Sequence, residues 1–187
     1  VRREGMLFAP ESGDQLFAGD QIYVFSHAED VGRTLEIFGK SSRKQERVVV
    51  IGAGNVGLAV ATHLENAPER IRAKVIEKDR ARAEEAADKL ERTIVLNGDG
   101  LDMALLREAN IERADAVLAV TDDDKTNILA AVRAKMAGCP MAICLVNDPS
   151  LATLMEPLGI DAYINPRATT VSSILRHVRH GRVRGVY

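Results

Sequence analysis

The sequence predicts an α/β protein whose main part is a doubly wound, Rossmann-like parallel sheet. Three observations lead to this fold class. From residue 47 onwards, short runs rich in Val and Ile alternate with segments whose apolar residues lie at helical spacing. The runs are almost continuously apolar, which is typical of parallel strands buried on both faces. A glycine-rich turn, Gly52 to Gly57, joins the first strand directly to the first helix.

The pattern after residue 46 places each element of this sheet in turn. Strands are expected at 47–51, 73–77, 93–96, 116–121, 142–146 and 162–165. Helical segments are expected between them, at 55–66, 79–90, 101–110, 125–137 and 149–158. A last helix near the end of the chain is expected to carry its apolar side on Val171, Ile174, Leu175 and Val178.

Residues 1–39 follow a different pattern of short runs and turns. Apolar residues alternate over 4–10, the stretch 21–26 is typical of a strand, and 29–38 has apolar residues at helical spacing. Residues 40–46 are small, polar and charged, which indicates a linker. Because so short a segment buries little surface alone, we interpret 1–39 as the end of one domain and 47–187 as a second, complete domain.

Composition excludes several classes of function. The 187 residues carry 25 Lys and Arg against 27 Asp and Glu, so the net charge gives no indication of a nucleic-acid partner. No apolar run reaches the roughly 18–20 residues that span a bilayer, which predicts a soluble protein. Cys139 and Cys144 are expected to be reduced and structural, since further Cys or His partners for zinc are missing around them. We expect neither a metal site nor catalytic residues.

The glycine-rich turn has the pattern G-x-G-x-x-G between a strand and a helix, which favours binding of the phosphates of a nucleotide. Gly52 permits the tight turn, Gly54 leaves room for a phosphate against the backbone, and Gly57 allows close packing of helix and strand. Backbone N–H groups at the start of the helix would then face the phosphates. The alternative is a turn that uses glycine only for packing.

Two acidic residues follow later strands of the predicted sheet. Glu77 ends the second strand, 20 positions after Gly57, where a carboxylate accepts the ribose hydroxyls of an adenosine and disfavours a 2′-phosphate. The alternative is a solvated acid at a strand end. Asp99 follows the third strand and could accept a hydrogen bond from an adenine amine, with Gly100 leaving room for the ring. Turn chemistry alone explains this stretch equally well.

The end of the fourth strand supplies further candidates. Thr121 lies at the carboxyl edge of the predicted sheet, where ligands of such folds bind. Asp123 or Asp124 could serve only as the cap of the helix that follows.

Several motifs in order resemble the RCK family, the regulators of potassium conductance. The run GAGNVG, the strand ending at Glu77, Asn97-Gly98-Asp99, the stretch 114–127 and Ile164-Asn165-Pro166 resemble an RCK N-terminal (TrkA-N) domain. The beginning of the chain, with Pro10-x-x-Gly13-Asp14 and Gly19-Asp20, resembles the end of an RCK C-terminal (TrkA-C) domain.

This resemblance implies a cytoplasmic regulator at the inner face of the cell membrane. It implies binding of NAD(H) first, with ATP or ADP as alternatives, and control of a membrane potassium channel of the TrkH or TrkG type. It also implies a homo-oligomer, paired through the last helix and forming a ring in the full-length protein. The implied cofactor-binding residues are Gly52, Ala53, Gly54, Asn55, Val56, Gly57, Glu77, Lys78, Asp99, Gly100, Thr121 and Asp122.

One departure from the family pattern leaves other functions open. Many members carry an arginine near the end of the fifth strand, close to the phosphates, and the stretch 143–146 has none. An assembly element with a vestigial nucleotide site is therefore one alternative. A fragment of an NAD-dependent dehydrogenase is the other, although no His, Lys or Tyr after the sixth strand is placed as its acid or base.

Overall fold

The computed structural model describes residues 1–3, 6–27, 30–39, 46–68 and 71–180, the last five by their backbone alone. The chain divides into two compact units, Val1–Arg43 and Lys44–Tyr187. The predicted linker lies almost wholly outside the described residues. Across the described part of the chain, every helix is too short or too polar to cross a membrane.

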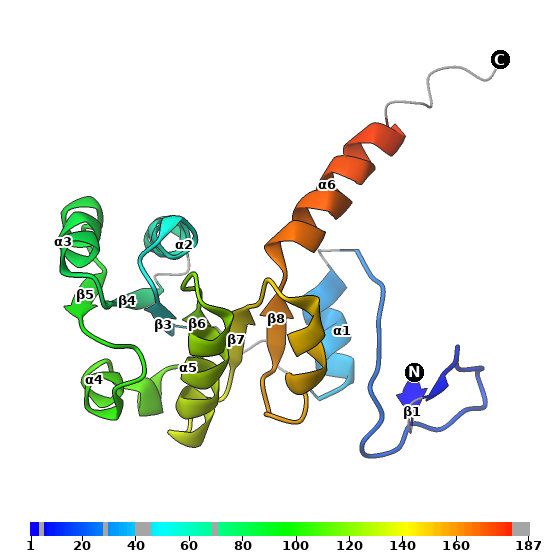
Figure 1. Ribbon diagram of the computed structural model, residues 1–187. Helices are drawn as coiled ribbons and strands as arrows, with labels where there is room; N and C mark the ends of the chain where they lie inside the picture. Colours follow the sequence, from blue (N-terminus) through cyan, green and yellow to red (C-terminus); the bar gives the residue numbers. More distant parts are fainter. Residues whose placement is uncertain (4–5, 28–29, 40–45, 69–70, 181–187) are drawn as a thin grey trace. The chain divides into compact units, whose positions relative to one another are not determined.

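The second unit contains a six-stranded, wholly parallel sheet with the order β5-β4-β3-β6-β7-β8 (Figure 1). The chain starts in the middle at β3 and winds outwards in both directions, so the order reverses between β3 and β6. This confirms the doubly wound, Rossmann-like fold. The strands are β3 (Arg47–Ile51), β4 (Arg72–Glu77), β5 (Ile94–Asn97), β6 (Ala116–Ala119), β7 (Ala142–Leu145) and β8 (Ala162–Ile164).

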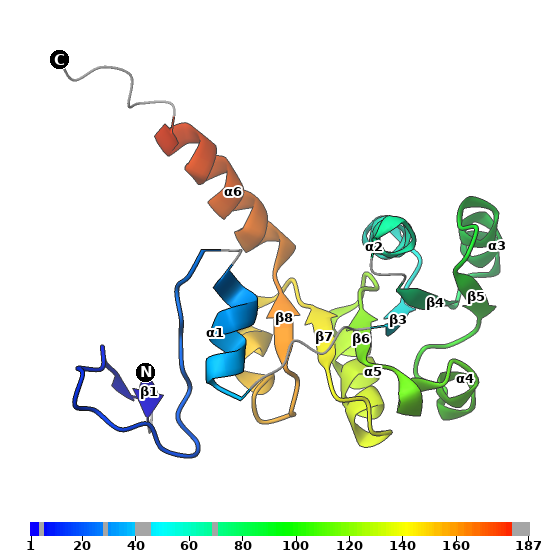
Figure 2. The ribbon, with the colours of Figure 1, turned by 180° about the vertical axis from the view of Figure 1, so that it is seen from behind.

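Helices cover both faces of this sheet. One face carries α2 (Asn55–Asn66) and α3 (Arg80–Lys89), and the other carries α4 (Met103–Glu108) and α5 (Asp124–Met136) (Figures 1 and 2). The helix α6 (Pro166–His180) follows β8 and projects away from the sheet. The helix α4 is shorter than predicted, because Asn110 adopts a left-handed conformation and leads into an unpredicted 3₁₀ turn, η2 (Ile111–Arg113).

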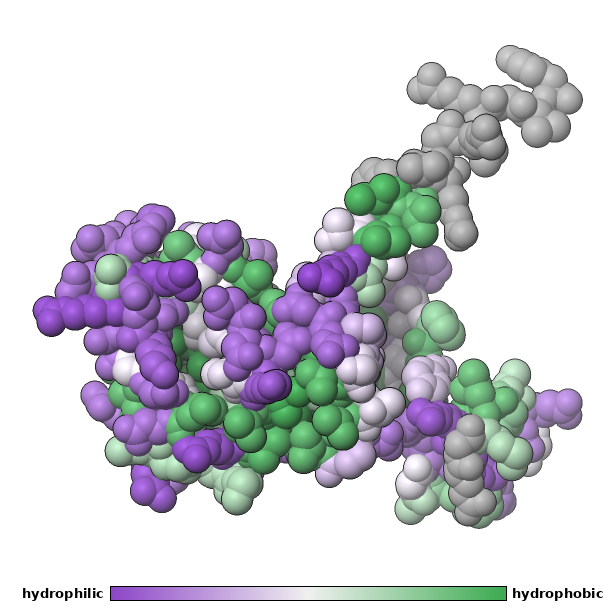
Figure 3. All heavy atoms as spheres, in the orientation of Figure 1, coloured by the Kyte–Doolittle hydropathy of each residue, from purple (hydrophilic) through white to green (hydrophobic). Residues whose placement is uncertain are grey.

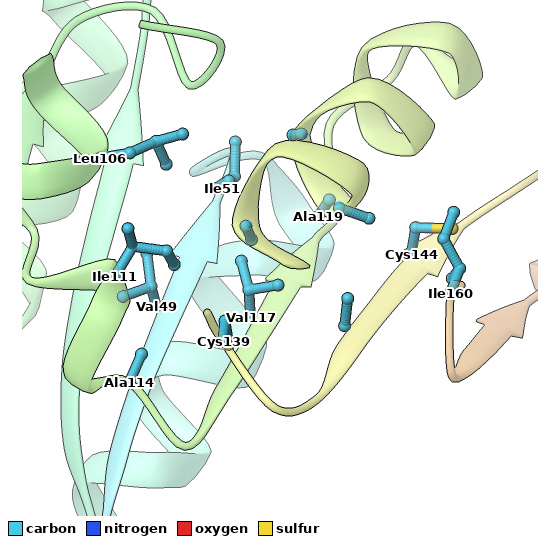
Figure 4. Packing of buried hydrophobic residues seen from close by; sticks show 14 of the residues in the cluster. Val49, Ile51, Leu106, Ile111, Ala114, Val117, Ala119, Cys139, Cys144 and Ile160 are labelled. Atoms are coloured by element: carbon cyan, nitrogen blue, oxygen red, sulfur yellow. The ribbon is translucent and has the colours of Figure 1, made fainter. Parts of the chain in front are cut away.

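The core explains why the strands are apolar on both faces. Successive residues of β3 enter opposite layers: Val49 and Ile51 pack with α4 and α5, whereas Val48 and Val50 pack with α2 and α3. Figure 4 shows the first of these layers between the strands and the helices. Cys144 is fully buried in it, and burial raises the pKa of its thiol to about 11, as expected of a structural cysteine.

The predicted helix at 149–158 is wrong in type. The segment forms a 3₁₀ helix, η3 (Pro149–Leu154), followed by turns. Its N–H groups bond three residues back, as from Leu151 to the Asp148 carbonyl, and Met155 is its only fully buried side chain. With a single buried anchor, the segment lacks the apolar stripe that stabilises a longer α-helix.

The first unit has little regular structure among its described residues. A two-stranded antiparallel pair, β1 (Arg2–Arg3) with β2 (Met6–Leu7), is followed by α1 (Val31–Ile37). The predicted strand at 21–26 is wrong: Gln21 makes one bridge to Arg2, and the residues after it extend without a strand partner in the described unit. Phe25 is 97% exposed, so no apolar layer covers this segment there. Its identity as the end of an RCK C-terminal domain stays a prediction.

Candidate functional site

The three glycines of the turn between β3 and α2 meet different surroundings. Gly52 has φ +102°, a conformation that favours glycine, and its N–H donates to the Ile76 carbonyl at 2.8 Å. A Cβ atom on Gly57 would lie 1.8 Å from the carbonyl oxygen of Gly52. A Cβ atom on Gly54 would meet nothing within 4 Å. Gly52 and Gly57 are therefore needed by the turn itself, whereas the space beside Gly54 is open.

The N-terminus of α2 lies at this open space without a side-chain cap. Its N-cap is Gly54, which has no side chain to accept hydrogen bonds from the first turn. The helices α3, α4 and α5 are instead capped by the carboxylates of Asp79, Asp102 and Asp123. The first N–H groups of α2, at the positive end of its dipole, are thus left for an anion or water.

A cavity of about 240 Å³ lies beside the turn, at the carboxyl ends of β3, β4, β5 and β6. It brings together most of the predicted residues from four separate segments of the chain. Those that line it are Gly52, Gly54, Glu77, Lys78, Asp99, Gly100, Thr121 and Asp122.

A second hollow, of about 370 Å³, shares Gly54 with the first and lies between α2 and α3. Ala53 and Asn55 line it. Val56 and Gly57 line neither hollow, so any role of theirs in ligand binding rests on the backbone.

Glu77 is tied to the glycine turn. Its side chain is only 8% exposed; one carboxylate oxygen accepts the N–H of Ala53 at 2.6 Å and the other accepts the N–H of Asp79 at 2.8 Å. A solvated strand-end acid is therefore excluded. Each oxygen keeps a second lone pair. The carboxylate can thus fix the turn and still accept a hydroxyl from the cavity.

We expect Glu77→Gln to lower the free energy of unfolding by about 1–2 kcal/mol without any ligand, because the new amide NH₂ would face one of the two N–H donors that the carboxylate now accepts, of Ala53 or of Asp79. Urea unfolding followed by circular dichroism measures this. Glu108→Gln, on the exposed surface of α4, is the matched control and should change stability by less than about 0.5 kcal/mol. Equal effects of the two variants would contradict the structural role of Glu77.

Asp99 forms part of both the turn and the cavity wall. Its carboxylate accepts the Leu101 N–H at 2.9 Å and pairs with the Lys78 ammonium at 2.9 Å. These bonds, that to Leu101 first, hold the pKa of Asp99 below its usual value, so it is an ionised acceptor at neutral pH. Gly100 is required by packing too, since a Cβ atom there would lie 2.3 Å from Cγ2 of Ile51. The geometry therefore fits both alternatives: Asp99 stabilises the turn, and it can also accept a hydrogen bond from an adenine amine.

Thr121 is held in place by Asn127, whose role the sequence did not reveal. The Asn127 side chain is fully buried in α5; its Oδ1 accepts the N–H of Thr121 at 2.8 Å, and its Nδ2 donates to the carbonyls of Thr121 and Leu145, each at 3.0 Å. The sequence signal that could have revealed it is a polar amide among the apolar residues of a helix, because a buried amide must find hydrogen-bond partners. Asn127 thereby fixes the backbone at the far end of the cavity.

The two aspartates after Asp122 have structural roles. Asp123 accepts the Thr126 N–H at 2.8 Å as the cap of α5. Asp124 accepts the N–H groups of Asn147 and Asp148 and so holds the loop after β7. The capping alternative thus holds for Asp123.

Arg82 is a second residue that sequence reasoning missed. It lies in the first turn of α3 and lines both hollows beside Gly54. The sequence offered one indication of this role, namely a basic residue five positions after Glu77.

A larger hollow lies in the first unit, but few of the polar groups that bind a ligand specifically line it. It measures about 820 Å³, and among the described residues it is lined mainly by apolar side chains, with that of Arg2 as the one charged side chain. Nowhere in the described chain do three or more His, Cys, Asp or Glu side chains gather as metal ligands. The glycine turn therefore remains the candidate site.

Comparison with solved structures places the fold. The TrkA-N domain of the inner membrane protein ybaL from Escherichia coli aligns with 71% of this chain and 96% of its own, with a TM-score of 0.63 and 15% identity. The GsuK RCK domain aligns with 83% of this chain and 32% of its own, with a TM-score of 0.62 and 19% identity. At these identities the likeness concerns the fold alone.

Comparison of sequences places the family. The Trk system potassium uptake protein TrkA of Azorhizobium caulinodans is 44% identical over 187 residues, which is all of this chain and 41% of that protein. TrkA of Haemophilus influenzae is 34% identical over 186 residues, 100% of this chain and 40% of its own. The chain thus spans about two fifths of the length of these relatives. Residues 48–166 match the model of the TrkA-N domain, and the chain belongs to the TrkA-N domain family.

Proposed function

We propose that the second unit binds an adenine nucleotide at the glycine turn and that this binding regulates potassium uptake through a membrane channel. The observation that carries the proposal is the uncapped N-terminus of α2 at Gly54, which opens onto a cavity lined by Glu77 and Asp99. An open helix N-terminus binds phosphate, and a carboxylate at the end of the second strand binds ribose.

The proposed ligand is NAD(H), with ATP or ADP as alternatives. The backbone from Gly52 to Val56 would surround the phosphates, and Glu77 would accept the ribose hydroxyls while disfavouring a 2′-phosphate. Asp99 and Gly100 would flank the adenine next to Lys78, and Thr121 with Asp122 would line the far end. Proteins of the same fold support this choice, since solved structures include the GsuK channel bound to NAD and GsuK bound to ADP.

The proposed partner is a membrane potassium channel of the TrkH or TrkG type. The relatives that this chain matches along its whole length are named as Trk system potassium uptake proteins, which supports a regulatory place at the cytoplasmic face of the membrane. A nucleotide that binds two arrangements of the domains with different affinity shifts their populations, and the channel would respond to that shift. We propose a regulatory domain without catalysis.

We also propose that a second copy of the chain packs on α6. Val171, Ile174 and Leu175 are 54%, 57% and 48% exposed and lie along one side of the helix, while the side chain of Val178 lies outside the described residues. In the space-filling view, hydrophobic residues form a cluster on part of this helix (Figure 3). A surface of this kind marks an interface more often than a free surface.

We expect Ile174→Asp to weaken self-association at least tenfold, because the new carboxylate would be buried without a partner. Sedimentation equilibrium over a range of concentrations measures this effect. Ser172→Asp adds the same charge to an exposed position of the helix and is the control. Equal association of the variant and the wild type would contradict the role of α6.

Calorimetric titration with NADH, NAD, ATP and ADP tests the binding proposal against its alternatives. An assembly element with a vestigial site predicts no binding heat with any of them. A dehydrogenase fragment predicts substrate-dependent oxidation of NADH that disappears when one side chain is replaced.

A further inference from the structure

We propose that Arg82 is a phosphate-binding residue, whose guanidinium contacts the phosphates of a nucleotide held at the glycine turn. This inference rests on the function proposed above. The backbone N–H of Arg82 donates to the Asp79 carboxylate at 2.9 Å, which fixes its position in the first turn of α3. From there its side chain lines the 240 Å³ cavity and the 370 Å³ hollow, which meet at Gly54.

The other cations of these two hollows are already paired. Lys78 forms its ion pair with Asp99 at 2.9 Å, and Lys89 forms one with Glu85 at 2.5 Å. The guanidinium of Arg82 makes no ion pair or hydrogen bond to any residue in the described ranges. The pKa of the Glu85 carboxyl is lowered mainly by its hydrogen bond with Lys89, and the positive charge of Arg82 makes a smaller contribution. Among the residues that the structure describes, Arg82 is therefore the cation that is available to a ligand in both hollows.

The geometry of the turn makes phosphate the fitting partner. The N–H groups at the start of α2 reach a phosphate from one side, and no side chain at Gly54 blocks the approach. A guanidinium presents several donors in a planar fork that matches two phosphate oxygens. Arg82 would bring this charge from α3, whereas β7 and the residue after it, 142–146, contain no arginine. In this chain the positive charge beside the phosphates would therefore come from α3, and not from the end of the fifth strand of the sheet.

The test is calorimetric titration of the whole chain with ADP, using the wild type, Arg82→Ala, Arg82→Lys and Arg80→Ala. We expect Arg82→Ala to weaken ADP binding about tenfold, with a smaller dependence on salt, and Arg82→Lys to recover part of the loss. Arg80→Ala is the matched control, because Arg80 lies in the same turn, pairs with Glu84 at 2.9 Å and lines neither hollow. It should bind ADP within about twofold of the wild type.

The outcomes separate this inference from the proposed function. If the wild type binds no nucleotide, the proposed function fails and the role of Arg82 fails with it. If the wild type binds ADP and Arg82→Ala binds it equally well, only the role of Arg82 is overturned. Equal losses in Arg80→Ala and Arg82→Ala, or an unchanged salt dependence in Arg82→Ala, would also overturn it, since the effect would not come from a direct ionic contact.

Discussion

Replacing Gly57 by alanine is expected to destabilise the sheet domain by about 3 kcal/mol or more, enough to leave much of it unfolded. The added Cβ atom would lie 1.8 Å from the carbonyl oxygen and 2.9 Å from the carbonyl carbon of Gly52. Both contacts are with backbone, so no side-chain rotation relieves them. Either α2 moves away from β3 or the turn loses its shape. Urea unfolding followed by circular dichroism measures the loss.

Gly54→Ala is the control for this effect, since it adds the same methyl group three residues earlier, where nothing lies within 4 Å. We expect a change within about 1 kcal/mol, the usual cost of alanine at an N-cap. Similar losses of stability in the two variants would contradict this account. They would mean that glycine is needed in this turn for chain flexibility, and that the close approach of α2 to β3 does not cause the destabilisation.

Replacing Gly54 by aspartate is expected to weaken nucleotide binding at least tenfold and leave the fold intact. The new side chain enters open space, where it can cap the first N–H groups of α2 as Asp79 caps α3. It then occupies the donors that a phosphate needs and places a negative charge beside them. Calorimetry with NADH and ADP gives the affinity, and thermal unfolding gives the stability, which should be equal or higher.

Asn66→Asp is the matched control, because it adds the same charge at the opposite end of α2. The two ends of this 12-residue helix lie roughly 16 Å apart, beyond the screening length at physiological salt. We expect Asn66→Asp to bind nucleotide as the wild type does. Unchanged affinity in Gly54→Asp would contradict the assignment of the turn to phosphate.

The sheet was predictable because each strand carries its own signal. Residues 48–51 of β3 are buried on both faces of the sheet and must all be apolar, and the observed strand, Arg47–Ile51, has the predicted ends. The stretches 21–26 and 149–158 show the limit of such reasoning. Their local patterns fit a strand and a helix, but regular structure there also needs a partner strand or a wide buried face, which a local pattern does not report.

The candidate site was predictable for two kinds of residue: the polar residues that directly follow a strand, and the glycines of the turn. Glu77, Asp99 and Thr121 were expected at one edge of the sheet, and the structure lines one cavity with all three. Arg82 and Asn127 were missed because each lies on a helix and acts through the direction in which it faces. Helical spacing gives the apolar side, but it does not show which polar residue faces a neighbouring loop or cavity.

Titration of the wild-type chain with nucleotides tests the central claim most directly. We predict saturable binding of NADH or ADP with a stoichiometry of one per chain, and loss of at least tenfold in affinity in Gly54→Asp under the same conditions. Absence of binding heat with NADH, NAD, ATP and ADP, from a chain that circular dichroism shows to be folded, would contradict it.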